Sequence, residues 1–440
     1  MKKIAAFIIG ALAFSSGKVH AQAGADTILH DVELETCIQY ALNNYPLIKQ
    51  NLLDQKITES QIKGKLSAWY PQVNTTSMYQ NTFQKLTTVT TLGVFSAGTY
   101  NTSQVAVAAS QNLFNRDALL ASKSAEDVRQ NTRNTTISNK IDLVANVSKT
   151  YYSILTLMQQ IKVLDEDIIR LQRSHKDAFN QYKAGTVDNT GYKQAQINLN
   201  TSIAQKRGYE SMIPSYYEQL RTFLNYPNSK ELTIHYDSLA LEQSAIIDTN
   251  STVNWEKRIE YKTLQTNKNL LMANLKYEKW SYLPTVSLYA TYNLNYFNNR
   301  FSPLYNNNFP QSYVGLQVTM PIFQGGLRKQ NIRQAQLNLD RNDFDFQNLK
   351  NTVNQQYQTA ISTYKSDFAN YQANKENMEL AQEVYNTVDL QYRAGVKMYL
   401  DVITAETTLR TAKINYTNSL FLLLSDKVDV QKALGDIQPN

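Results

Sequence analysis

The sequence holds few of the side chains from which catalytic or metal sites are built. It contains one cysteine, Cys37, and four histidines in 440 residues, and none of these has the spacing of zinc ligands. Neither a serine–histidine motif nor a glycine-rich phosphate loop is visible. A lone cysteine within a helical pattern indicates a buried, unreactive thiol. The residues therefore predict no catalytic site, no metal site and no cofactor, and we do not expect an enzyme.

Among the acidic residues, Asp401 has the most informative position. It follows Tyr392, Gly395 and Lys397, about one and a half turns into a segment with a helical pattern. A carboxylate there is favoured by the helix dipole and by capping. If several chains surrounded a pore, the same carboxylate would repeat around the axis and act as an electrostatic filter. The two interpretations are compatible. The pair Asp188-Asn189, just before an earlier helix, is expected to be an N-cap rather than a gate.

Two long uninterrupted runs must position these residues. Residues 117–184 and 327–394 each span 68 positions without a glycine or a proline. Since those two residues usually break helices, each run predicts one very long helix. At 1.5 Å per residue such a helix extends roughly 100 Å.

Both runs end at nearly the same motif. Tyr182 and Gly185 close the first as Tyr-Lys-Ala-Gly, and Tyr392 and Gly395 close the second as Tyr-Arg-Ala-Gly. We therefore expect these residues to form two helix-turn tips, where the chain turns back on itself.

The chain reads as two copies of one pattern, helix, strand, strand, long helix, helix. Pro71 and Pro284 precede the strand pairs at corresponding places. The first repeat is predicted at 22–229, with strands at about 72–90 and 104–114, a long helix at 117–184 and a helix at 187–226. A connecting segment follows at 230–252. The second repeat is predicted at 253–440, with strands at about 285–297 and 312–323, a long helix at 327–394 and a helix at 397–434.

The N-terminus is typical of an export signal. Lys2 and Lys3 precede a short apolar core, and Val19-His20-Ala21 is similar to a cleavage site. The core is too short to span a bilayer. Residues 1–21 are therefore predicted to be a signal peptide.

The composition argues against two classes of protein. A net charge of +7 without a Lys/Arg cluster argues against nucleic-acid binding, and a mean hydropathy of −0.44 argues against a bundle of membrane helices. The predicted strands alternate apolar and polar residues, as in membrane barrels. Four strands cannot close a barrel, whereas three chains would supply twelve. Two alternatives remain open, a soluble β-sandwich on a coiled coil and a structural or adhesive exported coiled-coil protein.

The chain resembles the TolC-type outer-membrane efflux channels over nearly its whole mature length. The resemblance rests on the duplicated halves, the strand starts at Pro71 and Pro284, the turn 321–326 and the paired Tyr-x-Ala-Gly motifs. It implies an α+β membrane protein, a homotrimer whose twelve-stranded β-barrel lies in outer-membrane lipid, with a long periplasmic α-helical tunnel. It also implies an exit duct for efflux or type I secretion, with a periplasmic adaptor and an inner-membrane transporter of the RND or ABC type as partners.

The same resemblance implies a periplasmic entrance at the second tip. Tyr392 and Gly395 match the family's turn, Lys397 takes the basic position, and Asp401 takes the first aspartate position. Two positions depart from the family pattern, because Thr404 stands at the second aspartate position and Gly191 stands at the equivalent of Asp401 in the first half. The ring of acids at the entrance is therefore expected to be thin, with three carboxylates per trimer from Asp401.

Overall fold

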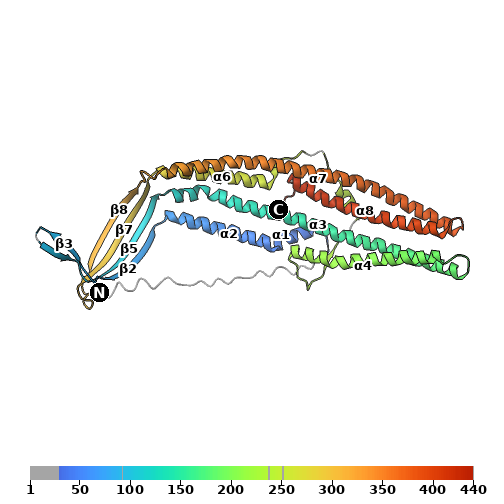
Figure 1. The fold of residues 1–440 in the computed structure, drawn as a ribbon, viewed down its shortest axis with the longest axis horizontal. Helices are drawn as coiled ribbons and strands as arrows, with labels where there is room; N and C mark the ends of the chain where they lie inside the picture. Colours follow the sequence, from blue (N-terminus) through green and yellow to red (C-terminus); the bar gives the residue numbers. More distant parts are fainter. Residues whose placement is uncertain (1–28, 92, 236–237, 250–251, 440) are drawn as a thin grey trace.

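The protein is elongated, with a β-sheet at one end and long helices reaching away from it (Figure 1). The computed structural model describes residues 29–91, 93–235, 238–249 and 252–439. The signal peptide expected at 1–21 lies outside these residues.

Two very long helices form the body of the molecule, α3 (Arg116–Lys183) and α7 (Leu327–Arg393). The side chain of Asn115 caps α3 by accepting hydrogen bonds from the amides of Asp117 at 2.8 Å and Ala118 at 3.2 Å. The remaining helices and 3₁₀ turns are α1 (Leu34–Asn44), α2 (Pro46–Leu66), η1 (Ser67–Trp69), α4 (Thr190–Leu224), α5 (Ser238–Ala245), η2 (Trp255–Lys257), α6 (Ile259–Lys279), η3 (Trp280–Tyr282) and α8 (Tyr399–Leu434). None of the described helices is at once long enough and apolar enough to cross a bilayer.

Two predicted helix starts were too early. The structure begins α4 at Thr190 rather than 187, and α8 at Tyr399 rather than 397. The turns that precede these helices are longer than expected, because each glycine is followed by several non-helical residues. Lys397 therefore lies in the turn, and Asp401 lies in the first turn of α8 rather than one and a half turns along it.

A four-stranded antiparallel sheet joins the two halves of the chain. Its order is β2 (Gln72–Asn81), β5 (Asn101–Phe114), β7 (Thr285–Asn298) and β8 (Phe309–Thr319). The central pair, β5 and β7, comes from different halves, with Val105 opposite Leu294 and Val107 opposite Tyr292. The outer strands β2 and β8 leave both edges of the sheet open.

The strand bounds differ from the predicted ones in several places. The first strand ends at Asn81, not near 90, and the chain between it and β5 contains a separate hairpin, β3 (Leu86–Thr90) and β4 (Gly93–Ala97). The strands β5 and β8 begin at Asn101 and Phe309, each three residues earlier than predicted. Threonine and valine favour strands, and the neighbouring glycines hid that preference in the sequence pattern. The last strand, β8, ends at Thr319 rather than 323.

A second, smaller sheet lies at the middle of the molecule. Strand β1 (Leu29–Val32) pairs in parallel with β6 (Leu232–Ile234), which belongs to the connecting segment at 230–252. The strand β1 was not predicted, since four residues carry little periodic signal. The Tyr151 hydroxyl donates to the carbonyl of His235 at 2.7 Å and so ties α3 to this sheet.

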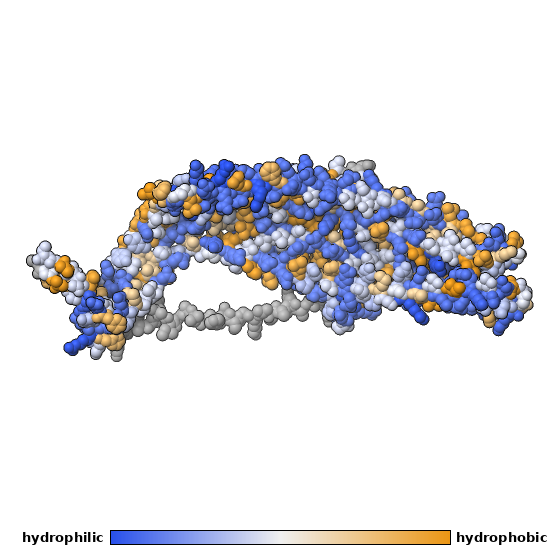
Figure 2. All heavy atoms as spheres, viewed as in Figure 1, coloured by the Kyte–Doolittle hydropathy of each residue, from blue (hydrophilic) through white to orange (hydrophobic). Residues whose placement is uncertain are grey.

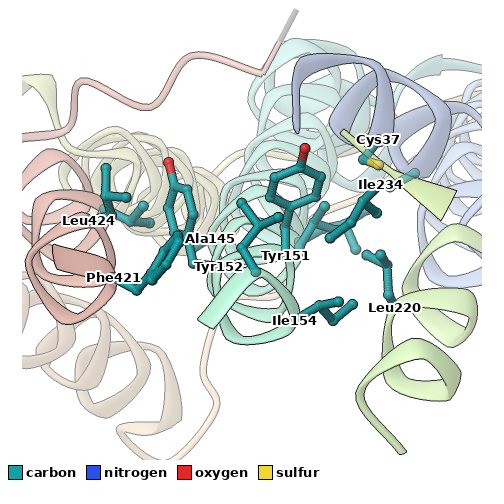
Figure 3. Packing of buried hydrophobic residues seen from close by; sticks show 14 of the residues in the cluster. Cys37, Ala145, Tyr151, Tyr152, Ile154, Leu220, Ile234, Phe421 and Leu424 are labelled. Carbon is teal, nitrogen blue, oxygen red and sulfur yellow. The ribbon is translucent and has the colours of Figure 1, made fainter. Parts of the chain in front are cut away.

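The main hydrophobic core surrounds α3 at this level. Tyr151 faces Cys37 and Ile234 on one side of the helix, while Tyr152 faces Phe421 on the other (Figure 3). Burying both sides of one helix anchors α3 between the two halves. Cys37 is fully buried, and burial raises the pKa of its thiol to about 12, which keeps it protonated at neutral pH.

Helices α8 and α6 meet end to end beside α3 and α7. Arg258, which is 5% exposed, donates to the last carbonyls of α8, those of Lys432 and Ala433, both at 3.1 Å. It also forms two hydrogen bonds to the carboxylate of Glu260, at 2.9 and 2.8 Å. One guanidinium therefore satisfies the C-terminus of one helix and fixes the N-terminus of the next.

Candidate functional site at the helical tips

The two long helices end in matching turns. Gly185 and Gly395 have φ of +73° and +75°, in the left-handed region that glycine adopts without strain. The amide after each glycine donates to the carbonyl five residues earlier, at 3.1 Å in the first turn and 2.9 Å in the second, as in a Schellman motif. In the first turn the N-cap residue of α4 is Asn189, whose side chain makes no capping hydrogen bond, while the carboxylate of Asp188 before it accepts from the Thr190 amide at 2.9 Å.

Aromatic side chains hold each tip and connect the two. Tyr182 packs against Tyr192 with ring centroids 5.0 Å apart, and Tyr392 packs against Tyr399 at 5.8 Å. The Gln181 side-chain amide donates to the Tyr392 hydroxyl at 2.8 Å. The hydrogen bond from Gln181 to Tyr392 therefore links the two tips.

Gly191 makes close contact with the opposite tip. A Cβ atom at this position would lie 3.3 Å from Cδ1 of Tyr399. That separation is tighter than nearly all real Cβ contacts, so any side chain at 191 would push the ring away. The absence of an aspartate at Gly191 thus has a packing reason, since the α8 tyrosine occupies the space.

Asp401 caps its own helix and is partly exposed to solvent. Its Oδ2 accepts from the Met398 amide at 3.1 Å, which caps the start of α8. Thr404 is exposed, and its hydroxyl donates to the Leu400 carbonyl of its own helix at 2.9 Å. Lys397, Asp401 and Thr404 line one groove of about 750 Å³ between α7 and α8.

A buried polar cluster lies farther from the tips, where α3, α4 and α8 meet. Asp167 on α3 is 1% exposed, and its Oδ2 accepts from the Ser202 hydroxyl of α4 at 2.8 Å. Arg410 on α8 lies 3.4 Å from the same oxygen and donates to the Ser202 hydroxyl at 2.7 Å. Arg170 lies 3.4 Å from the other Asp167 oxygen. Three helices from both halves therefore share one buried carboxylate.

Glu406 of α8 extends this cluster toward the tips. It is 2% exposed, its Oε1 accepts from the Ser174 hydroxyl of α3 at 3.1 Å, and its Oε2 has no hydrogen-bond partner. Burial is the main cause that raises the pKa of Glu406 to about 7, and the nearby Asp167 carboxylate adds to it. The same burial raises the pKa of Tyr399.

No pattern in the sequence indicates this cluster. Asp167 and Arg410 are separated by 243 residues, and Glu406 stands in an ordinary helical segment. Only the meeting of the two halves brings them together. In the described ranges no group of three or more His, Cys, Asp or Glu side chains could hold a metal ion.

The chain matches a known protein family over most of its length. A profile of the family described as "Outer membrane efflux protein" matches residues 37–225 and 265–436. The chain is similar to outer membrane protein TolC of Salmonella enteritidis, 20% identical over 99% of this chain and 87% of TolC. TolC of Escherichia coli is also 20% identical, over 67% of this chain and 62% of that protein, so this match spans less than two thirds of the relative.

A solved structure shares the fold. The Campylobacter jejuni CmeC outer membrane channel superposes with a TM-score of 0.72, at 17% identity, over 91% of this chain and 85% of CmeC. The sheet at one end and the long helices ending in paired tips are therefore the fold of that channel.

Proposed function

The chain belongs to the outer membrane efflux protein family, and from this premise we propose that three copies share one twelve-stranded barrel and a periplasmic helical tunnel. Family membership makes the protein an outer-membrane exit duct for efflux or type I secretion. The observation that carries the assembly proposal is the four-stranded sheet with two open edges. The duplicated halves at 22–229 and 253–440 would each give two strands to it.

Open sheet edges are the first argument for several copies. In a bilayer every backbone N–H and C=O must be paired, so a sheet that enters the membrane has to close. Both edge strands, β2 and β8, are almost wholly exposed in one chain. Since the sheet is antiparallel throughout and has an even number of strands, β8 of one copy can pair antiparallel with β2 of the next.

The number of copies follows from the width of the duct. Two copies would give eight strands, and the interior of an eight-stranded barrel is filled by side chains. Three copies give twelve strands and leave room for a passage. A homotrimer is therefore the smallest closed assembly of this chain that can conduct.

The strands have the composition expected of a barrel wall. The strands β2, β5, β7 and β8 contain no Asp, Glu, Lys or Arg. Val105, Val107, Leu288, Leu294 and Leu316 share one face of the sheet by register, which suits outer-membrane lipid. The opposite face carries mainly amide, hydroxyl and tyrosine side chains, which suit a wet interior.

The helical tips are the proposed periplasmic entrance. In a trimer Asp401 would repeat three times around the axis, with Lys397 beside it, and Tyr392 and Gly395 would shape the turn. Asp401 caps its helix through one oxygen, so the cap and the charge filter can coexist. We propose passive conduction through this entrance.

The tips are also the proposed contact with the rest of the pump. Val396, Met398 and Leu400 are 73%, 78% and 66% exposed beside the second turn. Hydrophobic side chains are visible at the tip end in Figure 2. Exposed apolar residues of this kind suit a protein partner. A periplasmic adaptor that joins the duct to an inner-membrane transporter, of the RND or ABC type, is the partner we propose.

The assembly can be tested with purified protein. The protein should require detergent for extraction from membranes, should have three times the mass of one chain, and should form stable channels in planar bilayers. Recovery of a monomeric rod without detergent would contradict the proposal, and would favour a structural or adhesive coiled-coil protein.

A further inference from the structure

The buried polar cluster between the two helical hairpins has a property that a passive duct does not need. We infer that Glu406, together with Asp167, Ser202 and Arg410, forms a proton-responsive clasp that holds the α3–α4 hairpin against the α7–α8 hairpin. The inference rests on the proposed entrance at the tips, because the clasp would set how easily that entrance opens.

The position of the cluster is the first argument. Helix α8 packs closely along α3 but makes few contacts with α4. Arg410 of α8 reaches Ser202 of α4 at 2.7 Å, and both contact the Asp167 carboxylate of α3. Separating the hairpins would therefore break these bonds and leave charged groups without partners, which is costly when they are buried.

Glu406 is the second argument, because it is buried without a cation bound to it. Its only hydrogen bond in the described structure comes from Ser174, and Oε2 has no partner. A neutral carboxylic acid tolerates this position much better than a carboxylate does. Glu406 is thus compatible with close packing of the two hairpins mainly in its protonated form. We call this contact between the α3–α4 and α7–α8 hairpins the seam.

The surroundings of Glu406 strengthen this preference. The carboxylates of Asp167 and Asp389 raise the pKa of Glu406 further, and Arg170, which lowers it, is engaged by Asp167. Uncharged Ser202 is the contribution of α4 to the cluster. The charged and titratable groups near Glu406 are Asp167 and Arg170 on α3, Tyr385 and Asp389 on α7, and Tyr399 and Arg410 on α8.

The sign of the pH effect follows from linkage. The pKa of Glu406 is raised by burial to about 7 in the closed seam, and it would return toward its ordinary value, 4.5, once the seam opened to water. The closed form therefore binds the proton more tightly, so acidification favours closure. The gain is complete below the ordinary pKa and is lost as the pH rises through about 7. The difference between these two pKa values shifts the equilibrium roughly three-hundredfold.

Two other groups serve as controls for the pH response. Asp426, which faces Asp367, also has its pKa raised to about 7 by burial, but it lies in the core region of α8 and not at this seam. His175 is next to Ser174 in sequence, yet its ring packs against Phe179 and Tyr192. If either group were responsible for a pH response, its substitution would remove that response.

The direct test measures the separation of the tips in the purified full-length protein. Spin labels are attached to cysteines introduced at Val187 and Val396, which are 43% and 73% exposed, in a Cys37→Ala background. Labelled chains are diluted with unlabelled ones, and distances are measured by pulsed electron resonance at pH 5.5 and pH 8. We expect a short, narrow distribution at pH 5.5 and a longer, broader one at pH 8.

Variants assign the response. Glu406→Gln should keep the short distribution at both pH values, while Asp426→Asn and His175→Gln should respond like the parent. Ser174→Ala removes a hydrogen bond that lowers the pKa of Glu406, so it should move the midpoint to higher pH and supports the assignment if Glu406→Gln does not fold. A parent protein without a pH response, or a response retained in Glu406→Gln, would overturn the clasp.

The same preparations separate the clasp from the proposed function. Channel formation in planar bilayers tests the duct, and the label distances test the clasp without requiring conduction. A pH-independent distance in a conducting trimer would remove the clasp and leave the duct. A pH-dependent distance in a protein that forms no channel would support the clasp and contradict the duct.

Discussion

Replacing Gly191 by alanine should loosen the two tips although alanine is the better helix former. Gly191 lies in the first turn of α4, and a Cβ there would be 3.3 Å from Cδ1 of Tyr399. Tyr399 comes from the opposite hairpin and its hydroxyl is buried. The added methyl group therefore acts on the contact between the hairpins and not within its own helix.

The expected size follows from two opposing effects. Alanine in place of glycine within a helix stabilises by roughly 0.5–1 kcal/mol. Overpacking of a well-filled contact costs about 1–3 kcal/mol. We expect a net destabilisation of the Gly191→Ala tip by about 1 kcal/mol. Gly208 in the same helix has no atom within 4 Å of its Cβ position, so Gly208→Ala should show only the stabilising effect.

Native-state hydrogen exchange of the two variants measures this difference. Amides in the first two turns of α4 and α8 should exchange several-fold faster in Gly191→Ala, and amides around Gly208 should exchange more slowly in Gly208→Ala. Single-channel recordings should show more frequent opening only for Gly191→Ala. If the two substitutions gave the same exchange and conductance, the contact between Gly191 and Tyr399 would not hold the tips together.

Three further substitutions test other parts of the structure. Asp401→Asn should keep the cap on the Met398 amide but remove the charge, so it should shift the reversal potential in a salt gradient. Asp401→Ala should remove the charge and also weaken the start of α8 by about 1 kcal/mol. An unchanged reversal potential in both variants would show that Asp401 is only a cap. Arg258→Met should remove the hydrogen bonds to the Glu260 carboxylate and to the Lys432 and Ala433 carbonyls, lowering the free energy of local opening at the end of α8 by about 1–3 kcal/mol as measured by hydrogen exchange, and protection equal to that of the parent would contradict this account. Cys37 should resist maleimide labelling at neutral pH until the protein unfolds, because burial raises the pKa of its thiol to about 12. Rapid labelling of the folded protein would show that the core opens there.

The long helices and their turns were accessible from sequence because their signals are local. Glycine-free runs ending at Gly185 and Gly395 require no knowledge of tertiary contacts. The strand alternation in β7 was similarly clear. The hairpin β3–β4 was missed because its threonines and glycines also suit a loop, and β1 was missed because a four-residue strand depends on its partner β6.

The buried cluster could not be predicted for a different reason. Arg410 joins Asp167 and Ser202 only when the two halves pack together, and no spacing within either half indicates it. The departure at Gly191 was visible in the sequence, but its cause was not, because the ring that fills the space belongs to Tyr399 on the other half. Duplicated chains hide such contacts, since each half by itself looks complete.

The structure also changes where the energy that keeps the entrance closed should be sought. The tip carries a single acid per chain at the expected filter position, Asp401, and one of its oxygens is occupied by the cap of its own helix. In the proposed trimer, repulsion among the three Asp401 carboxylates in water is weak, because charges at exposed sites are screened. The contacts that join the hairpins are instead the Tyr399 ring against Gly191, the hydrogen bond from Gln181 to Tyr392, and the buried cluster behind them. Opening would have to separate these contacts first, so substitutions in the seam should change the opening probability more than substitutions of charge at the tip.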